Sequence, residues 1–465
     1  TLSPGGLTPT HSIAPRTAYA TWLEATDAQV QSLAVALRFA PGETTGEGYL
    51  DFIEVNGLVP LRFDGGQLAV YNSRHLGSTA AFRLTGSTSQ ARVWDVSRHN
   101  RVTEPAIANG QWADSTAQGK AYIVFDGSRL PAPAAIEPLA NQNLHGSDAA
   151  DYVVVTHPLL RAQADRLAAL HAVVDQMNTL VVSDEEVYNE FSSGKQDPMA
   201  LRAFLRWLAA QHPDRPPRYM LLLGKASYDP RNILGHNLPT VVTYETPFSF
   251  DDDGISYASD DMMGYLAPDA TGGSGQTLDV AIGRLPAKSV AEAAHMVDKV
   301  EGYLTRRDLG ATGSSGDWRN CVALLADDAD PGHPGDTSFV HSSEVVAGRI
   351  GQRYPRLNVD RLYADAYTQQ SGAIGSFYPE LKNALRQRMD YGCLLINYIG
   401  HGSTHYIGTE RYIEAADVAA YSNRDRLPVF ITSTCSYGYH DLPDEECGAE
   451  ACLLAAFLDR KSTRL

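Results

Sequence analysis

The stretch Cys393-Leu-Leu-Ile-Asn-Tyr-Ile399, which runs into Gly400-His401-Gly402-Ser403, decides the fold class of this chain. A short, continuous and mainly apolar run is typical of a strand that is buried on both faces of a parallel sheet. The glycines on either side of His401 allow another chain to approach the backbone closely. The stretch therefore predicts a buried strand whose carboxyl end presents an imidazole at an accessible turn.

A second stretch has the same layout. Residues 428–434 read Pro-Val-Phe-Ile-Thr-Ser-Thr and run into Cys435-Ser436, which lies 34 positions (435 − 401) after His401. That distance leaves room for one helical crossover, which we place near residues 415–420. Ligands of open α/β sheets bind outside the carboxyl ends of the strands. We therefore expect His401 and Cys435 to lie side by side at such an edge.

An imidazole beside a thiol is the arrangement of a cysteine nucleophile and its base, because the imidazole favours the reactive thiolate. The backbone N–H groups of Gly402 and Cys435 could then form an oxyanion hole. Two plainer interpretations stay open. His401 could be a loop imidazole bonded to backbone, and Cys435 an inert thiol.

A catalytic imidazole usually needs an acid that orients it. The strand Cys321–Leu325 is followed by acidic residues, of which Asp328 is our candidate, with Asp327 and Asp330 as rivals. A calcium loop or solvated carboxylates would explain the same run. Further candidates are Glu450, which could instead be a charge at a helix start, and the alternative bases His405 and His440, which we expect in solvent.

The pattern along the chain predicts two α/β units behind an all-β region. Residues 1–148 alternate short β-prone runs with turns, as in a sandwich. Strands and helices alternate from 149 to 309 and again from 317 to 465, which predicts parallel sheets. The predicted strands of these units are 152–155, 180–182, 219–223 and 280–282, then 321–325, 359–363, 393–399 and 429–434. The abrupt ends of the chain suggest truncation, above all in the last unit.

Composition excludes several classes of protein. The net charge of −17 argues against nucleic-acid binding, which needs clustered Lys and Arg. Five cysteines without a CxxC pair predict neither a disulfide framework nor a structural zinc site. We expect no required cofactor. Bound calcium is compatible with the acidic runs, including Asp251–Asp253 and Ser259–Asp261, although solvated loops are the favoured explanation of those two because neither matches an EF-hand spacing.

Residues 397–403 (Asn-Tyr-Ile-Gly-His-Gly-Ser) and 432–435 (Thr-Ser-Thr-Cys) resemble the His and Cys motifs of the gingipain-type cysteine peptidases. More specifically, the chain resembles the type IX secretion sortases, which are C-terminal signal peptidases. That resemblance spans about residues 45 to 458 and includes Gln142–His145, Val187–Gly194, Leu221–Gly224 with Ser227–Asp229, Ser259–Asp261, Ile282–Pro286, Met296–Lys299 and Asp365–Tyr367.

The resemblance implies two α/β subdomains, of which the second is caspase-like and carries the dyad of His401 and Cys435. It implies that Gly402 contributes to the oxyanion hole and that Asp328 is the orienting acid. It does not imply a preference for arginine, because Ser338 stands near the position that sets it. After Glu450 the chain departs from the pattern, since the remaining strands of the caspase-like sheet are missing.

The implied substrates are exported proteins that carry C-terminal secretion signals. The implied partners are lipopolysaccharide, as acceptor of the cleaved protein, and outer-membrane secretion subunits, and the implied location is extracytoplasmic. Two other functions stay open. One is a gingipain-like secreted peptidase without a sortase role, and the other is a non-catalytic export or interaction module.

Overall fold

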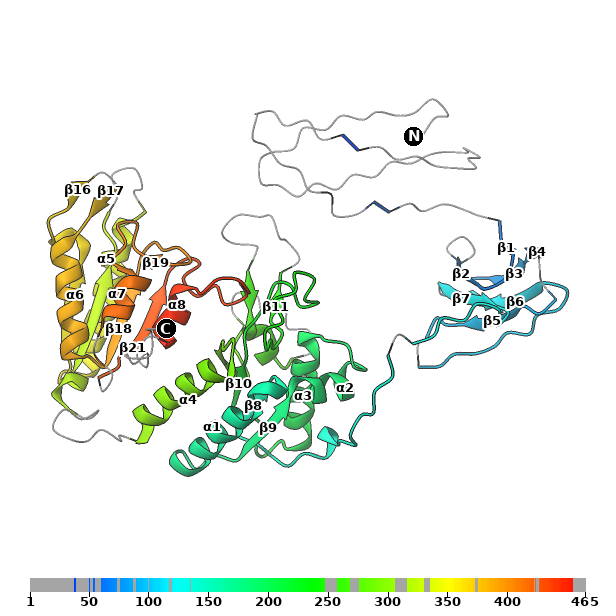
Figure 1. Cartoon of the computed structure of the whole chain (residues 1–465), viewed down its shortest axis with the longest axis horizontal. Helices are drawn as coiled ribbons and strands as arrows, with labels where there is room; N and C mark the ends of the chain where they lie inside the picture. Colours follow the sequence, from blue (N-terminus) through cyan, green and yellow to red (C-terminus); the bar gives the residue numbers. More distant parts are fainter. Residues whose placement is uncertain are drawn as a thin grey trace, which may run out of the picture. The chain divides into compact units, whose positions relative to one another are not determined.

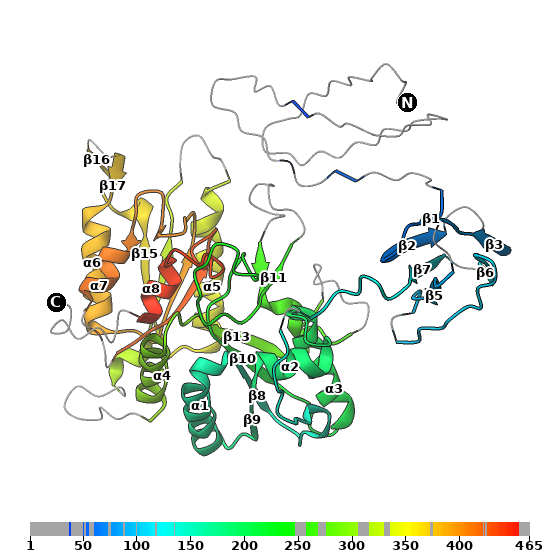
Figure 2. The same cartoon turned by 45° about the vertical axis from the view of Figure 1, so that its right-hand side comes forward.

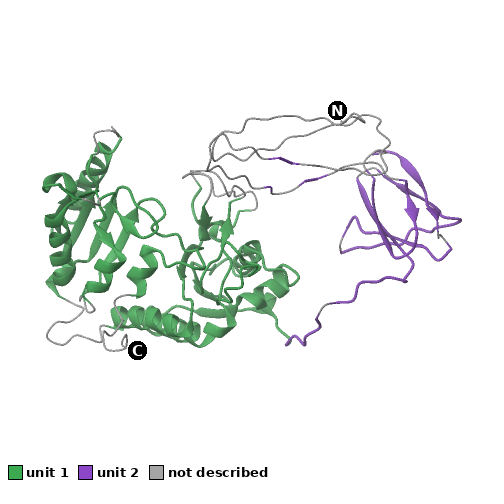
Figure 3. Ribbon diagram, turned by 45° about the horizontal axis from the view of Figure 1, so that its top comes forward, with its two compact units in different colours: residues 1, 5–24, 141–465 green, residues 2–4, 25–140 purple. Residues whose placement is uncertain are grey.

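The computed structural model describes residues 60–246, 257–267, 276–305, 316–329 and 335–454, with short gaps at 73–75, 87–88, 99, 117–118, 134, 373–374, 422 and 424–425, together with residues 37–38, 50 and 53–54. The chain divides into two compact units between Ala140 and Asn141 (Figure 3). Asp251–Asp253, Asp330 and the predicted C-terminal end beyond residue 454 lie outside the described residues.

In the described residues of the N-terminal unit, every regular element is a strand. Strand β7 pairs antiparallel with β2 and β5, and β3 pairs antiparallel with β6. Trp112 and Tyr122 pack edge to face in its core, beside Val93 and Val124. The strands are β1 (Arg62–Phe63), β2 (Gln67–Asn72), β3 (Thr79–Arg83), β4 (Thr85–Gly86), β5 (Arg92–Asp95), β6 (Gln111–Ser115) and β7 (Lys120–Phe125).

The second unit begins with what we call the first α/β half, residues 141–305. Its parallel sheet has the order β13-β10-β8-β9 (Figure 1). The strands are β8 (Tyr152–Thr156), β9 (Thr179–Ser183), β10 (Tyr219–Leu223) and β13 (Ala281–Leu285). The helices are α1 (Arg161–Val174), α2 (Asp184–Phe191), α3 (Pro198–Gln211) and α4 (Val290–Thr305). Shorter elements are β11 (Tyr244–Glu245), β12 (Ala258–Ser259) and η3 (Asp260–Gly264).

Both faces of this sheet are covered by helices, as continuous apolar strands require. Val153 and Val155 of β8 pack into a core with α2 and α3. Tyr152 and Val154, which point to the other face, pack into a core with α1 and α4. Helix α2 begins at a capping box, in which Ser183 and Glu186 satisfy each other's backbone N–H groups.

The second α/β half, residues 316–454, holds another parallel sheet with the order β15-β14-β18-β21. Figure 1 labels β18 and β21, and Figure 2 labels β15. Its strands are β14 (Cys321–Ala326), β15 (Asn358–Tyr363), β18 (Leu395–Ile399) and β21 (Val429–Ser433). Its helices are α5 (Thr337–Arg353), α6 (Pro379–Tyr391), α7 (Ala415–Ala420) and α8 (Gly448–Leu454). Shorter strands are β16 (Gln370–Gly372), β17 (Gly375–Phe377), β19 (Tyr406–Ile407) and β20 (Ile413–Glu414).

This second sheet is also buried on both faces. Leu325 of β14 and Ile396 of β18 pack into a core with α6, while Leu324 packs on the opposite face with α5. The predicted mixture of helices and parallel strands is therefore confirmed. In the described residues, no helix is both long and apolar enough to cross a bilayer.

Candidate active site

His401 lies two residues beyond the end of β18, and the residues around it fix its backbone. Its N–H donates to Asp327 Oδ2 at 2.8 Å, and its carbonyl accepts from the Tyr398 hydroxyl at 2.5 Å and from Gly408 N–H at 2.8 Å. A Cβ at Gly400 would stand 2.4 Å from Asp327 Cβ, which explains the glycine there. The imidazole is thus held in place while 45% of the side chain stays exposed.

Cys435 lies two residues beyond the end of the neighbouring strand β21, as His401 does beyond β18. Ile399 of β18 is the register partner of Ser433 of β21. His401 and Cys435 each lie two residues beyond that pair. Both residues therefore follow neighbouring parallel strands at the same, carboxyl, end of the sheet. The thiol of Cys435 is free and exposed.

The turn after Cys435 has a strained backbone. Ser436 has φ of 40°, in the left-handed region that residues with a Cβ rarely adopt. The N–H of Tyr437 donates back to the carbonyl of Cys435. Such strain persists only where surrounding contacts hold the chain, and it is concentrated at functional sites. The turn is therefore consistent with a residue displayed for chemistry.

Gly402 lies close against the strand that carries Cys435. A Cβ at position 402 would stand 2.3 Å from Thr434 Oγ1, so a larger residue would push the two loops apart. Gly402 also forms an antiparallel β-bridge with Ile407. The hydrogen bonds of that bridge are made by the neighbouring residues, so the N–H of Gly402 takes no part in them. The backbone hydrogen bonds of the described residues include none donated by the N–H of Gly402 or of Cys435. Both predicted oxyanion donors are therefore available to a ligand.

The carboxylate at the imidazole belongs to Asp336, a residue that the sequence did not single out. His401 Nε2 lies 3.3 Å from Asp336 Oδ1, and the ring of Phe339 packs edge-on against the imidazole at 5.2 Å between centroids. Asp336 is buried and immediately precedes α5, but its side chain does not cap that helix. Its carboxylate is therefore directed to Nε2 of His401. The other ring nitrogen, Nδ1, is the one left to accept a proton from a thiol.

Asp328, the predicted orienting acid, makes other contacts. Its carboxylate accepts hydrogen bonds from the Tyr378 hydroxyl at 2.7 Å and the Tyr412 hydroxyl at 3.0 Å. Its neighbour Asp327 contacts His401, but through the backbone N–H and not through the ring. The expected contact between Asp328 and the imidazole is thus absent from the described structure. The carboxylate that lies at the imidazole is that of Asp336, directly before α5.

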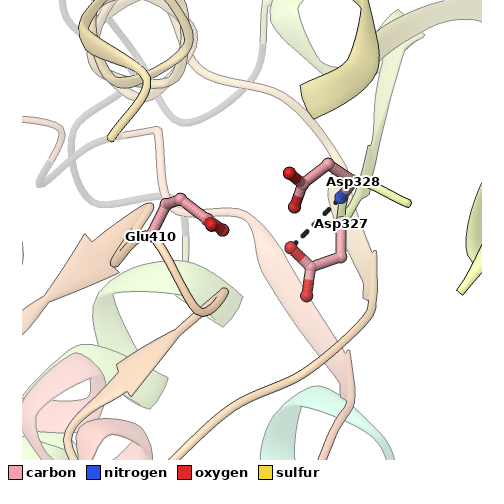
Figure 4. Close-up of side chains that lie close together, drawn as sticks. All are labelled: Asp327, Asp328 and Glu410. Atoms are coloured by element: carbon pink, nitrogen blue, oxygen red, sulfur yellow. Dashed lines mark hydrogen bonds between the residues drawn. The ribbon is translucent and has the colours of Figure 1, made fainter. Parts of the chain in front are cut away.

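Asp327, Asp328 and Glu410 form a buried acidic cluster, in which one oxygen of each lies within 4.8 Å of the others (Figure 4). The Tyr412 hydroxyl lies within hydrogen-bonding distance of all three carboxylates, yet it has one proton to donate. Burial, followed by the charges of Asp328 and Asp327, raises the pKa of Glu410 to about 7. Burial also raises the pKa of Asp327.

The cluster has the chemistry of a site for a hard cation. Its ligand atoms are carboxylate oxygens, which Ca²⁺ and Mg²⁺ prefer. In the described structure the carboxylates accept hydrogen bonds from tyrosine hydroxyls, backbone N–H groups and the Gln369 amide, with no Lys or Arg among the partners. Asp327, Asp328 and Glu410 are therefore the residues that would hold the predicted calcium.

The other cysteines differ from Cys435 in their surroundings. Cys321, Cys393 and Cys447 are buried, and Cys452 is partly exposed. Burial raises the pKa of the Cys393 thiol to about 12 and that of the Cys447 thiol to about 11, which disfavours the thiolate. Cys435 is thus the exposed cysteine in the described part of the chain.

Three further sequence interpretations change in the structure. His405 is exposed as expected, but His440 is mostly buried, 3.6 Å from Asp260, and burial lowers its pKa. Asp260, expected in a solvated loop, forms a largely buried ion pair with Arg284 at 2.7 Å. Glu450 is buried in an ion pair with Lys225. Among the described residues, no hydrogen bond or ion pair joins Glu450 to His401 or Cys435.

The family model of peptidase family C25 matches residues 145–457. Curated protein sequences give no match. Among solved structures, dimeric latent PorU from Porphyromonas gingivalis is 24% identical with a TM-score of 0.47, over 54% of this chain and 26% of that one. The Arg-specific cysteine proteinase gingipain R (RgpB) is 18% identical with a TM-score of 0.48, over 67% and 60% of the two chains.

A complex of the pro- and mature domains of RgpB from Porphyromonas gingivalis is likewise 18% identical, with a TM-score of 0.47. The chain spans about a quarter of the PorU chain that it matches. All three TM-scores are below 0.5, so these likenesses do not by themselves establish a function.

Proposed function

This chain belongs to peptidase family C25, and from that premise we propose that it is a cysteine peptidase in which Cys435 is the nucleophile and His401 the base. The observation that carries the proposal is the register of β18 and β21, which places the two residues at the same offset beyond one strand pair. The exposure of Cys435, against the burial of three other cysteines, supports the same assignment.

The proposed reaction begins with transfer of the Cys435 proton to His401 Nδ1, while Nε2 stays directed at Asp336. The thiolate attacks the scissile carbonyl and forms a tetrahedral oxyanion. The N–H groups of Gly402 and Cys435 would donate to that oxyanion, because neither donates a backbone hydrogen bond among the described residues. Protonated His401 then gives its proton to the leaving amine, and a thioester remains on Cys435.

We propose further that the substrates are exported proteins with a C-terminal secretion signal and that the enzyme acts as a sortase. The ordered matches outside the dyad, such as Ser227–Asp229 and Ile282–Pro286, support this narrower function, since the His and Cys motifs alone indicate only the wider group. Lipopolysaccharide as acceptor, outer-membrane secretion subunits as partners and an extracytoplasmic location belong to the same proposal. The caspase-like character of the second half also stays a proposal.

A sortase and a simple peptidase differ in what resolves the thioester. With a cargo protein that the enzyme cleaves, we expect added primary amine to appear in the product as an amide at the new C-terminus, in a fraction that rises with amine concentration. Intact-mass spectrometry distinguishes this adduct from the free carboxylate. A product that carries only the carboxylate at every amine concentration would contradict the sortase role and leave a hydrolytic peptidase.

The acidic cluster beneath His401 predicts that calcium stabilises the fold. A cation at Asp327, Asp328 and Glu410 would neutralise carboxylates that now share the proton of Tyr412. The cation would offset the negative charge of Asp327, whose carboxylate accepts the backbone N–H of His401. Ligand at 100 times its Kd adds about 2.7 kcal/mol to the free energy of unfolding.

The pH dependence gives this prediction its sign. The pKa of Glu410 is raised to about 7 in the folded protein, from about 4.3 in unfolded chains. Without a cation, stability from this group is full below the unfolded pKa and falls as pH rises to about 7. We therefore expect Ca²⁺ to raise Tm more at pH 8 than at pH 5, measured against EDTA. Glu410→Gln should reduce the shift, and equal Tm with Ca²⁺ and EDTA at pH 8 would refute the site.

A further inference from the structure

Helix α8 contacts both loops of the proposed dyad. The N–H of Gly448 donates to the carbonyl of Thr404, three residues after His401, at 2.7 Å. The N–H of Ala449 donates to the carbonyl of Tyr437, two residues after Cys435, at 3.1 Å. The start of α8 therefore joins the loop of the base to the loop of the nucleophile.

The fit between α8 and the turn after Cys435 is close. A Cβ at Gly448 would stand 2.0 Å from a ring atom of Tyr437, so the ring lies directly against the helix backbone at the glycine. The Tyr437 hydroxyl reaches Cys452 Sγ on the same helix at 3.5 Å. Tyr437 is itself bonded to the carbonyl of Cys435. A displacement of α8 would accordingly move the backbone that carries the nucleophile.

Two lysines of the first α/β half hold α8. Lys225, which follows β10, pairs with Glu450 on the first turn of the helix, and the two side chains are 0% and 2% exposed. Lys299 of α4 donates to the carbonyls of Cys452 at 2.7 Å and Leu453 at 3.3 Å, on the last turn. Helix α8 packs against α7 on one side and α4 on the other (Figures 1 and 2).

Glu450 also connects this anchor to the loop after Cys435. Its Oε1 takes the Lys225 ammonium, while Oε2 accepts the N–H of Cys447 at 3.2 Å. Earlier in the same loop, the carbonyl of Asp441 accepts the N–H of Tyr228, three residues after Lys225, at 2.9 Å. The segment from Cys435 to α8 is thus fastened to the first α/β half by these contacts and by the approach of His440 to Asp260.

We propose that Lys225 and Lys299 are positioning residues of the peptidase, which hold Cys435 and His401 in register through α8 and Glu450. The proposal rests on the proposed dyad. It gives the first α/β half, which contributes no residue to the chemistry, a role in catalysis.

Physical chemistry favours a positional role over a purely stabilising one. A buried ion pair often adds little or nothing to stability in comparison with apolar residues of the same volume, because both charges lose their hydration. The pair does fix the position of the Glu450 carboxylate, because one of its oxygens accepts from Lys225 while the other accepts from the Cys447 N–H. Replacing both charges should therefore preserve folding and disturb the geometry.

Two matched double variants test this. Lys225→Met with Glu450→Leu removes both charges and the acceptor for Cys447, and Lys225→Met with Glu450→Gln removes the charges but keeps an acceptor oxygen. The measurements are Tm, kcat and KM on a cleaved protein substrate, and the pH midpoint of iodoacetamide alkylation at Cys435, read by mass spectrometry. A merely structural role would change Tm and leave the alkylation midpoint of the folded protein unchanged.

We expect the Leu variant to fold, to lose about tenfold in kcat (the effect of 1.4 kcal/mol in the transition state) with little change in KM, and to shift its Cys435 midpoint toward that of an isolated thiol. The Gln variant keeps an acceptor for the Cys447 N–H but also lacks the Lys225 anchor, so it should show a comparable loss of both, and full recovery in it would overturn the role of Lys225. A Leu variant with the wild-type midpoint and kcat would overturn the proposal.

If the Leu variant does not fold, Lys299→Met makes the same test from the other end of α8, with a shifted midpoint as the supporting result and an unchanged one as the overturning result. A wild-type protein in which Cys435 reacts no differently from the other thiols would instead overturn the dyad, and this inference with it. The two failures are therefore distinguishable.

Discussion

Replacing Cys435 by alanine should abolish peptide-bond cleavage, with kcat/KM reduced by a factor of about 10⁴ or more, because removal of the nucleophile leaves only binding and the oxyanion donors. The measurement is cleavage of a protein substrate, followed by mass spectrometry, with Tm to confirm folding. Cys321→Ala is the matched control, since Cys321 lies at the amino end of β14, at the opposite edge of the sheet. It should retain activity.

The same experiment distinguishes a peptidase from a non-catalytic interaction module. A module that only binds partners would bind them equally well with Cys435 or alanine, and its Cys435→Ala variant would show no lost function. His401→Ala supports the assignment from the other side. It should reduce kcat by about 10²- to 10⁴-fold, the usual contribution of a general base, and slow alkylation of Cys435 near neutral pH. Cleavage at the wild-type rate in either variant would contradict the assignment of Cys435 and His401 as nucleophile and base.

The strands and their carboxyl ends could be predicted from sequence because they depend on local composition. The run Tyr219–Leu223 was predicted to the residue, since five apolar or aromatic residues ending at a glycine leave little choice. The strand predicted at 280–282 is displaced to Ala281–Leu285. Arg284 interrupted the apolar pattern there, and only the folded structure supplies its partners, Asp260 and the carbonyls of Gly224 and Val241.

Contacts that depend on register or on distant segments could not be predicted. Lys225 and Glu450 are 225 positions apart, and neither has a neighbour in sequence that signals the pair. An acidic residue near a helix start is ordinarily a favourable charge at the helix dipole, and that was one of the two interpretations open for Glu450, the other being a contact with the site. Its burial follows from the packing of α8 against the other half, which no local pattern encodes.

Asp336 was missed for a related reason. An aspartate directly before a helix is usually interpreted as its cap, whereas Asp328 follows a buried strand, where functional acids are expected. The contacts in the structure differ from both expectations. Asp336 leaves its helix uncapped and lies at the imidazole, and Asp328 bonds to tyrosine hydroxyls in the core of the acidic cluster.

The two acids therefore give opposite predictions. Asp336→Asn should lower kcat by about 10- to 100-fold, because a hydrogen bond to a charged partner is worth about 1.5–3 kcal/mol and each 1.4 kcal/mol changes a rate tenfold. The asparagine is isosteric, so KM and Tm should change little. Without the carboxylate, His401 is oriented less firmly and its protonated form, which must exist while the thiolate attacks, loses its counter-charge.

Asp328→Asn is the matched comparison, since it removes a buried carboxylate of the same size within the same half. We expect it to change Tm through the hydroxyls of Tyr378 and Tyr412, and to leave kcat near the wild-type value. The readout that separates the two is the pH profile of kcat/KM, which should narrow in Asp336→Asn and keep its width in Asp328→Asn. If instead Asp328→Asn lost activity and Asp336→Asn kept it, the orienting acid would be the residue that the strand end predicted, and the 3.3 Å approach of Asp336 to His401 would have no catalytic role.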